Sequence, residues 1–372
     1  MHQHIALVFG TRPEAIKLFP VIYALRERTS LRISVLVTGQ HRAMLDQVLA
    51  IADIRPDTDL NIMVPNQTLD GLTARLLLGI GEAFDADRPD SVIVQGDTTS
   101  AMVASLAAFY RKIPVAHVEA GLRTGNNYSP WPEEINRRII SPIAALHFAP
   151  TKLAAANLTR ENVDPVAIHI TGNTGIDALL LTKSRIDNLG ALTSGIRNFI
   201  APFRNQRIIL VTAHRRENFD VGLANIARAI KTLSMRDDVV IVFPVHPNPQ
   251  VLKVINATLK GSNNIVLLDP LEYVPFVYLM SAATLILTDS GGIQEEAPAL
   301  GKPVLVLRDT TERPEGIEAG TARLVGTNAK DIVSEAEWLL DDRHHYEKMS
   351  RATNPYGDGR ASERIASVVN DQ

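Results

Sequence analysis

The sequence contains no cysteine and no long apolar run, and each absence excludes classes of protein. Without cysteine there are no disulfides, no thiolate nucleophiles and no cysteine-ligated zinc or iron–sulfur sites. No run approaches the roughly 18 apolar residues of a membrane-spanning helix. The N-terminal apolar stretch HIALVFG is too short for a secretory signal and is followed by Arg12 and Glu14. We therefore expect a cytoplasmic protein.

The sequence also lacks an excess of basic residues and several familiar motifs. Lysine and arginine number 38 against 41 aspartates and glutamates, a net charge of −3. Neither nucleic acid nor a membrane is therefore expected as a partner. The histidines are scattered, and the metal motif HExxH and the glycine patterns GxGxxG and GxxxxGK[ST] are absent. We expect no metal, no NAD held in the usual Rossmann manner and no P-loop.

Short apolar runs, by contrast, alternate with longer helical segments along the whole chain, a pattern typical of parallel sheets covered by helices. The runs form two groups of six, at residues 4–10, 32–39, 91–97, 113–121, 144–150 and 167–173, and at 207–214, 239–246, 264–269, 284–289, 302–308 and 322–326. A chain of 372 residues also exceeds one typical core. We predict an α/β protein with two doubly wound, Rossmann-like domains that face a cleft.

Two turn-rich segments predict the domain limits. TGNTGID at 171–177 separates an N-terminal domain, residues 1–172, from a C-terminal domain, residues 173–359. NPYGDG at 354–359 precedes a last helix, and we expect residues 360–372 to return to the first domain. Ligands of parallel sheets bind beyond the carboxyl ends of the strands, so the residues that follow each strand are the candidates for a site.

Charged residues follow three strands of the first group. Gly10 permits a sharp turn, and Arg12 and Lys17 then place cations around a helix start, which the helix dipole disfavours unless an anion binds there. Asp97 and Glu119 directly follow the third and fourth strands. Simpler interpretations remain open: solvated cations for Arg12 and Lys17, and a helix N-cap for Asp97.

Further carboxylates lie in the next helix. Glu133 and Glu134 fall in its first turn, and one of them is interpreted as a favourable partner of the helix dipole. Arg137, one turn later, can form an ion pair with either glutamate. We expect Asp97, Glu119 and Glu133 to share one crevice, where like charges raise the pKa of at least one of them and suit it to proton transfer. His117, inside a strand, is interpreted as a core histidine.

The stretch LTDSGGIQEEAPALGKPV, residues 287–304, places two glycines where a strand turns into a helix. Ser290 as a cap and one glycine would satisfy local structure. The bare amides of Gly291 and Gly292 also suit a phosphate, and a carboxylate about one turn further on, Glu295 or Glu296, suits the hydroxyls of a ribose. Glu295 and Glu296 lie about 100° apart around the helix and cannot reach the same point, so one of them serves that role and the other is interpreted as structural.

Basic residues follow other strands of the second group. His214 stands beside Arg215 and Arg216, which indicates contact with a phosphate or a leaving group, with a structural histidine as the alternative. His246 follows the next strand, and Arg313 lies between hydroxyl residues and a proline.

Seven segments together resemble the non-hydrolysing UDP-N-acetylglucosamine 2-epimerase family, in order and over nearly the whole length. They are FGTRPEAIK, QGDTTS, HVEAGLRTG, WPEEINR, TAHRREN, DSGGIQEEAPALGKPVLVLRDTTERPE and NPYGDG. The resemblance implies a fold of the glycosyltransferase-B type, a homodimer, and reversible interconversion of UDP-GlcNAc and UDP-ManNAc without an added cofactor. It further implies elimination of UDP to a 2-acetamidoglucal, followed by re-addition.

The resemblance also implies roles for individual residues. The catalytic residues would be Asp97, Glu119, Glu133 and His214. The substrate would be bound by Arg12, Lys17, Asp97, Glu119, His214, Leu271, Phe276, Ser290, Gly291, Gly292, Glu296 and Arg313. Some bacterial members are activated by a second UDP-GlcNAc, and the positions resembling that regulatory contact are Gln40, His41, Gln67 and His246. Asn66 falls at a position where the family varies, and KLFP stands where the family commonly has KMAP.

Three other functions remain open on the same residues. A glycosyltransferase of this fold would use the same UDP site with an acceptor, and a hydrolysing epimerase would release free ManNAc and UDP. A non-catalytic sugar-nucleotide sensor would have no use for the crowded carboxylates.

Overall fold

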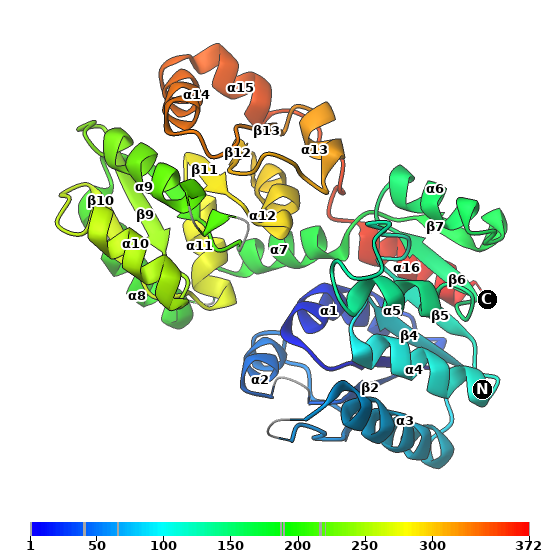
Figure 1. Cartoon of the computed structure of the whole chain (residues 1–372). Coiled ribbons are helices and arrows are strands. Elements are labelled where there is room, and N and C mark those ends of the chain that lie inside the picture. The colour runs from blue at the N-terminus through cyan, green and yellow to red at the C-terminus, as the bar shows by residue number, and fades with distance from the viewer. Residues whose placement is uncertain are drawn as a thin grey trace. The chain divides into compact units, whose positions relative to one another are not determined.

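The computed structural model describes residues 2–39, 42–64, 67–186, 188, 190–215, 218–219 and 221–371, without the side chains of residues 42 and 43. The chain forms two compact units, Met1–Ala178 with Gly357–Gln372, and Leu179–Tyr356 (Figure 1). Each unit contains one parallel sheet and its own helices. The α/β class with two doubly wound sheets is thereby confirmed. The division into compact units falls after Ala178, inside helix α7, and before Gly357. The domain limits expected at residues 172 and 360 stay predictions.

The described residues of unit 1 form seven parallel strands in the order β3-β2-β1-β4-β5-β6-β7. They are β1 (Gln3–Phe9), β2 (Leu31–Val37), β3 (Thr58–Asp59), β4 (Ser91–Gln95), β5 (Val115–Val118), β6 (Leu146–Ala149) and β7 (Ile168–Ile170). The expectation of six strands was wrong by one. Strand β3 has only two residues and no apolar pattern, and it forms by pairing with the edge strand β2.

The helices of unit 1 connect these strands. They are α1 (Arg12–Arg26), α2 (Arg42–Ile51), α3 (Leu69–Ala86), α4 (Thr99–Tyr110), α5 (Glu133–Ile140), α6 (Lys152–Arg160), the beginning of α7 (Thr174–Arg185 overall, continuing into unit 2 after Ala178), and α16 (Ala361–Asn370), with a 3₁₀ turn at Pro165–Ala167. Helix α16 belongs to unit 1 although it follows unit 2 in the chain. Its N-terminus is fixed by the buried carboxylate of Asp177, which accepts hydrogen bonds from the amides of Ala361 (3.2 Å) and Ser362 (2.8 Å).

Unit 2 has the six expected strands, in the order β10-β9-β8-β11-β12-β13. They are β8 (Arg207–Thr212), β9 (Val239–Pro244), β10 (Ile265–Leu268), β11 (Leu285–Thr288), β12 (Val304–Val306) and β13 (Ala322–Leu324). Its helices are α8 (Gly190–Ile200), α9 (Val221–Leu233), α10 (Pro249–Leu259), α11 (Tyr273–Ala282), α12 (Gly291–Glu296), α13 (Pro314–Glu318), α14 (Ala329–Asp341) and α15 (Arg343–Ser350), with 3₁₀ turns at Ala201–Phe203 and Ala297–Leu300.

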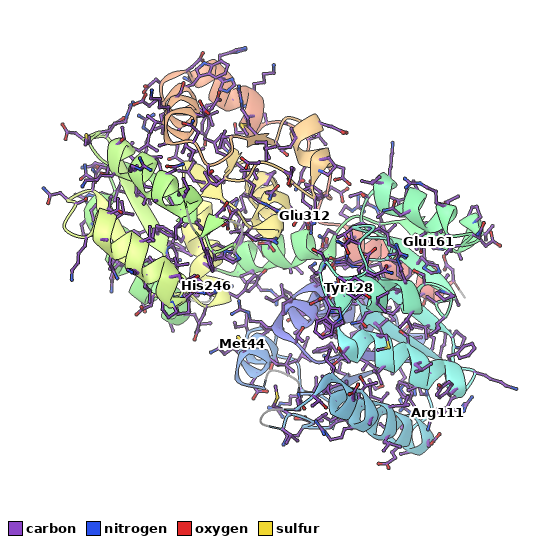
Figure 2. All side chains as sticks on the ribbon, viewed as in Figure 1. Met44, Arg111, Tyr128, Glu161, His246 and Glu312 are labelled. Atoms are coloured by element: carbon purple, nitrogen blue, oxygen red, sulfur yellow. The ribbon has the colours of Figure 1, made fainter. Side chains whose placement is uncertain are left out.

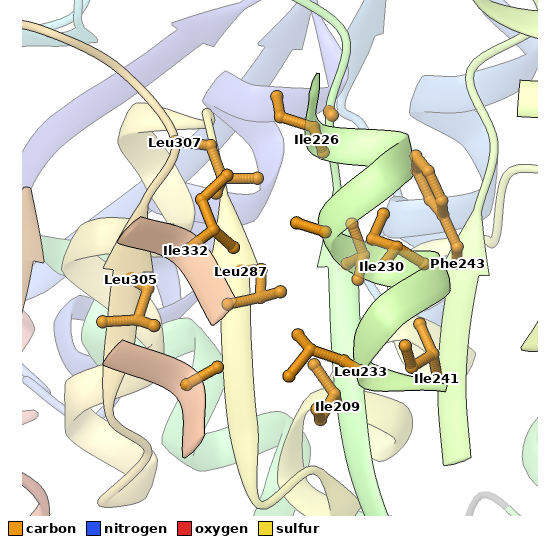
Figure 3. Packing of buried hydrophobic residues seen from close by; sticks show 14 of the residues in the cluster. Ile209, Ile226, Ile230, Leu233, Ile241, Phe243, Leu287, Leu305, Leu307 and Ile332 are labelled. Carbon is orange, nitrogen blue, oxygen red and sulfur yellow. The ribbon is translucent and has the colours of Figure 1, made fainter. Parts of the chain in front are cut away.

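Each face of the second sheet has its own apolar core. Ile209 on β8 packs with Ile230 of α9 and Ile332 of α14 on one face (Figure 3). The next residue, Leu210, belongs to a separate cluster on the other face. This alternation follows from the two-residue period of a strand and explains why a strand covered on both sides is apolar at nearly every position.

The strand order reverses between β1 and β4 in unit 1 and between β8 and β11 in unit 2. At such a switch point the connections leave toward opposite faces of the sheet, and a crevice opens at the carboxyl ends of the two strands. Each unit therefore has one place where its sheet is built to receive a ligand.

Candidate active site

The turn after β1 allows little space beside Gly10. A Cβ atom on this residue would lie 2.1 Å from Thr38 Oγ1 and 2.6 Å from Ser100 Oγ. Only glycine therefore lets the turn lie this close to β2 and α4. The turn leads directly into α1, which carries the expected ligand contacts Arg12 and Lys17.

Glu14 joins this turn to the next loop at the switch point. Its buried carboxylate accepts hydrogen bonds from the amides of Gly10 (3.0 Å) and Thr11 (2.8 Å), and its other oxygen accepts one from Thr98 Oγ1 at 2.6 Å. Burial raises the pKa of Glu14, and these hydrogen bonds partly offset the rise. Glu14 thus holds the β1–α1 and β4–α4 loops together, a role that the sequence analysis did not assign.

Asp97 follows β4 and faces helix α5. The N-cap of α4 is Thr98, which accepts a hydrogen bond from the amide of Ala101, so the capping interpretation of Asp97 was wrong. The Asp97 carboxylate instead pairs with Arg137, at 2.8 Å from Nε and 2.5 Å from Nη2. Asn136 also donates to the Asp97 carbonyl at 2.8 Å. The loop after β4 is therefore fixed to α5.

Glu119 follows β5 in an unusual backbone conformation. Its φ of +65° lies in the left-handed region, which residues with a side chain seldom adopt and which is concentrated at functional sites. One carboxylate oxygen, Oε2, forms an ion pair with Lys17 and accepts a hydrogen bond from Gln95 Nε2 at 2.6 Å. Cations from two helices thus hold Asp97 and Glu119 separately, so each carboxylate has a partner of opposite charge to offset the expected repulsion.

The two glutamates that begin α5 have different surroundings. Glu134 is fully buried and accepts hydrogen bonds from the amides of Thr124 (3.1 Å) and Gly125 (3.2 Å) and from Arg137 (3.1 Å). Burial alone would raise its pKa, but these donors lower it. Glu134 is thus the structural member of the pair. One oxygen of Glu133 is inaccessible to water and has no hydrogen-bond partner among the described residues.

His117 has the core position expected of it. Its side chain is buried on β5, and Nε2 lies 2.7 Å from the carbonyl of Gly96. Burial lowers its pKa to about 4, so the ring is neutral near neutral pH. The buried His147, paired in register on β6, has its pKa lowered to about 4 by the same cause.

In unit 2 the switch point is organised by Asp289, which the sequence analysis left without a role. This fully buried residue follows β11, and its Oδ2 accepts hydrogen bonds from the amides of His214 and Arg215, both at 2.9 Å. Asn218 Nδ2 donates to the same oxygen at 3.1 Å. Asp289 thus fixes the loop that follows β8 to the end of β11.

His214 is held between an acid and a second histidine. Its Nδ1 lies 3.3 Å from Asp289 Oδ1, and its ring is stacked on that of His246 with centroids 5.7 Å apart (Figure 2 labels His246). Burial, together with the nearby His246 and Arg215, lowers the pKa of His214 against the opposing effect of Asp289. The ring is therefore neutral near pH 7 and can accept or share a proton.

The glycine pair begins α12 as expected. A Cβ on Gly292 would meet no atom within 4 Å, so there is open space beside the α-carbon of this residue. Ser290 directs its own amide to Thr288 Oγ1 at 2.9 Å. Glu295 is buried and forms an ion pair with Arg313, which agrees with its structural interpretation. Glu296, the next residue, is only partly buried.

The remaining candidates are placed as follows. Leu271 and Phe276 are partly buried against the second core of unit 2. Gln67 lies in unit 1 and accepts a hydrogen bond from Arg75 at 2.6 Å, whereas His246 lies in unit 2. Gln40 and His41 lie outside the described residues. The described part of the chain contains no group of three or more acidic or histidine residues able to hold a metal ion. No described helix has the length and apolar character that crossing a membrane requires.

Comparison with known proteins shows which family the chain belongs to. The sequence profile of a family described as UDP-N-acetylglucosamine 2-epimerase matches residues 23–370. The chain belongs to this family. The resemblance found in the seven segments is thereby confirmed.

Individual members of the 2-epimerase family match over nearly their full length. A probable UDP-N-acetylglucosamine 2-epimerase from Ralstonia nicotianae is 54% identical over 368 residues, covering 98% of each chain. The UDP-N-acetylglucosamine 2-epimerase of Escherichia coli is 53% identical over 366 residues, covering 97% of each. The crystal structure of UDP-GlcNAc 2-epimerase from Neisseria meningitidis, bound to UDP-GlcNAc, has a TM-score of 0.89 at 47% identity and covers all of both chains. The expected Rossmann-like fold of the glycosyltransferase-B type agrees with this likeness.

Proposed function

We propose that the protein interconverts UDP-GlcNAc and UDP-ManNAc as a non-hydrolysing 2-epimerase. The observation that carries the proposal is Glu119, placed at the end of β5 in a left-handed conformation and fixed there by Lys17 and Gln95, in a chain of this family. A partly buried, oriented carboxylate beside a cation suits proton transfer next to an anionic leaving group.

The chemistry explains why both groups are needed. The proton on C2 of the sugar is not beside a carbonyl, so its removal to a carbanion would be costly. If a carboxylate takes this proton while the bond between C1 and the phosphate oxygen breaks, the electrons of the C2–H bond form a C1–C2 double bond and UDP leaves with the electrons of the C1–O bond. A proton then reaches C2 from the opposite face, and the UDP oxygen bonds to C1 again. No net water, electron or cofactor is consumed.

Unit 1 supplies the acids and bases in this proposal. Asp97, Glu119 and Glu133 are the candidates for taking and returning the C2 proton. One oxygen of Glu133 has no hydrogen-bond partner among the described residues, which supports its inclusion, because a buried acceptor of this kind is costly unless a ligand uses it. Arg12 and Lys17 are proposed to lie near the sugar and phosphates.

Unit 2 is proposed to hold the nucleotide during cleavage. The backbone of Ser290, Gly291 and Gly292 would contact the diphosphate together with Arg313, and the open space at Gly292 supports this assignment. Glu296 would accept hydrogen bonds from the ribose hydroxyls. His214, neutral and partly exposed, would contact the phosphates or the sugar.

The base would lie against the partly buried apolar side chains of Leu271 and Phe276. We include in the proposal a homodimer and a cytoplasmic location, as the resemblance and the sequence led us to expect.

Incubation with UDP-GlcNAc alone in D₂O tests the proposal. We expect UDP-ManNAc with deuterium at C2 and no consumption of UDP-sugar. Product without the label would exclude proton exchange at C2. Free ManNAc with UDP would indicate the hydrolysing reaction, and turnover that begins only when an acceptor is added would indicate a glycosyltransferase.

A further inference from the structure

Three arginines of unit 2 converge on the carboxylate of Glu312, which Figure 2 labels. Arg215 Nη2 lies 3.1 Å from Oε1, and Arg308 Nη1 lies 2.5 Å from Oε2. Arg313 Nη1 is 3.8 Å from Oε1. The pKa of Glu312 is lowered because its own amide and the positive charges of Arg308 and Arg313 outweigh the effect of burial. The carboxylate is therefore ionised near neutral pH.

Glu312 also lies against the turn that is proposed to bind the diphosphate. A Cβ on Gly291 would be only 3.3 Å from Glu312 Oε1, so the carboxylate covers the α-carbon of this glycine. Arg313, itself assigned to the phosphates, is shared between Glu312 and the buried Glu295. The Glu312 side chain is 32% exposed, and that of its partner Arg215 is 38% exposed. The carboxylate thus lies at the accessible end of the arginine cluster.

We propose that Glu312 is an internal counter-anion, which occupies the arginine nitrogens that the diphosphate of the ligand uses and is displaced when the nucleotide binds. The inference rests on the proposed function, since it takes the diphosphate to bind at Gly291 and Arg313. An exposed ion pair such as Arg215–Glu312 contributes little to stability, so stability alone gives weak reason for placing a carboxylate here. Competition with the ligand gives it a function. By competing for the arginines, Glu312 lowers the affinity for UDP and speeds the release of the nucleotide.

The net charge of the arginine cluster indicates how much UDP affinity should change when Glu312 loses its charge. Among the described residues, three guanidinium groups face Glu312 and Glu295 in this cluster, a local charge of about +1, and Glu312→Gln raises this charge to about +2. Two unit charges about 4 Å apart near a protein surface interact strongly, but solvent and salt screen part of this energy. We therefore expect the substitution to tighten UDP binding by about tenfold.

Calorimetric titration of the full-length protein with UDP tests the inference, with uridine as the second probe. The variant is Glu312→Gln, and the matched control is Glu318→Gln, which removes the same charge from an exposed position at the end of α13. We expect Glu312→Gln to lower the Kd of UDP about tenfold and leave that of uridine unchanged. Glu318→Gln should change neither. The gain should shrink at high salt, because the competition is electrostatic.

Each other result has a definite meaning. Unchanged or weaker UDP binding in Glu312→Gln would overturn the inference and make Glu312 a residue that orders the arginines for the ligand. Equal tightening of UDP and uridine would overturn it as well, because the effect would not involve the phosphates. If the unaltered protein binds no UDP, the proposed function fails and this inference fails with it, whereas normal UDP binding with no effect of Glu312→Gln leaves the proposed function intact. Thermal unfolding of both variants shows whether they remain folded.

Discussion

Gln95 donates a hydrogen bond of 2.6 Å to Oε2 of Glu119, the same oxygen that pairs with Lys17. Gln95 is the last residue of β4 and Glu119 directly follows the neighbouring strand β5, on the same side of the switch point. An amide and an ammonium group on one oxygen fix the plane of the carboxylate before any ligand binds. Such preorganisation suits a group that must meet a C–H bond in one orientation.

Glu119→Gln and Asp97→Asn should each lower kcat by about 10²- to 10⁴-fold, the usual contribution of a general acid or base, because an amide cannot take the C2 proton. The Kd of UDP should change little, since neither carboxylate is itself a proposed contact of the nucleotide, and most of those contacts lie in unit 2. Steady-state kinetics and calorimetry on the same preparations measure both quantities. Glu27→Gln, at an exposed position after α1, serves as the control. Parallel losses of turnover and affinity would make these carboxylates binding groups.

Two glycine substitutions should have opposite effects on stability and binding. Gly10→Ala places a Cβ 2.1 Å from Thr38 Oγ1, so it should destabilise the fold by about 1–3 kcal/mol or more through overpacking. Gly292→Ala meets no atom and lies inside a helix, so its stability should be unchanged or slightly higher. Its affinity for UDP should fall, because the Cβ occupies space that the diphosphate uses. Thermal unfolding and UDP titration distinguish the two, and normal UDP affinity in Gly292→Ala would contradict the assigned phosphate contact.

The buried histidines of unit 1 should make the fold sensitive to mild acid. His117 and His147 have pKa values lowered from 6.5 to about 4 by burial, so between these values the unfolded chain binds protons that the folded chain does not. Stability is therefore lost as pH falls from 6.5 to about 4, by roughly 3 kcal/mol for each ring. In His147→Gln the loss measured by urea unfolding should be smaller by about this amount. His344→Gln, on the exposed side of α15, should retain the full loss, and an equal loss in both variants would refute the attribution to His147.

The rate of epimerisation tests for regulation by a second substrate molecule. If the expected regulatory positions, including Gln67 and His246, serve such a site, the initial rate should rise sigmoidally with UDP-GlcNAc. Added UDP-GlcNAc should then accelerate the reaction that starts from UDP-ManNAc. Gln67→Ala should convert the curve to a hyperbola at similar maximal rate. A hyperbolic curve for the unaltered protein would exclude activation of this kind.

The sequence predicted the strands well because buried strands of a parallel sheet are apolar on both faces. It missed β3, whose two residues carry no such pattern and pair only because β2 offers an open edge. The position of Glu119 was predictable, since a charge directly after an apolar run must lie at the end of a strand. Its partner Gln95 was not, because the contact depends on the alignment of two strands.

Contacts between distant residues account for the other errors. Asp97 resembles a helix cap in sequence, yet Thr98 takes that place and Arg137, 40 residues away, binds the aspartate. In the sequence, Asp289 is only the residue that ends an apolar run. Its role in fixing the loop after β8 follows from the hydrogen bonds that it accepts from the amides of His214 and Arg215. Contacts between residues so far apart in the sequence cannot be predicted from their spacing along the chain.

The position of α16 has a consequence for biogenesis. Its buried residues Ile365 and Val369 complete the core of unit 1, and Asp177 can fasten its N-terminus only after the whole of unit 2 has left the ribosome. Unit 2 is contiguous in the chain and can mature first, although its synthesis begins later. Until α16 has been translated, unit 1 therefore lacks the helix that packs against α1.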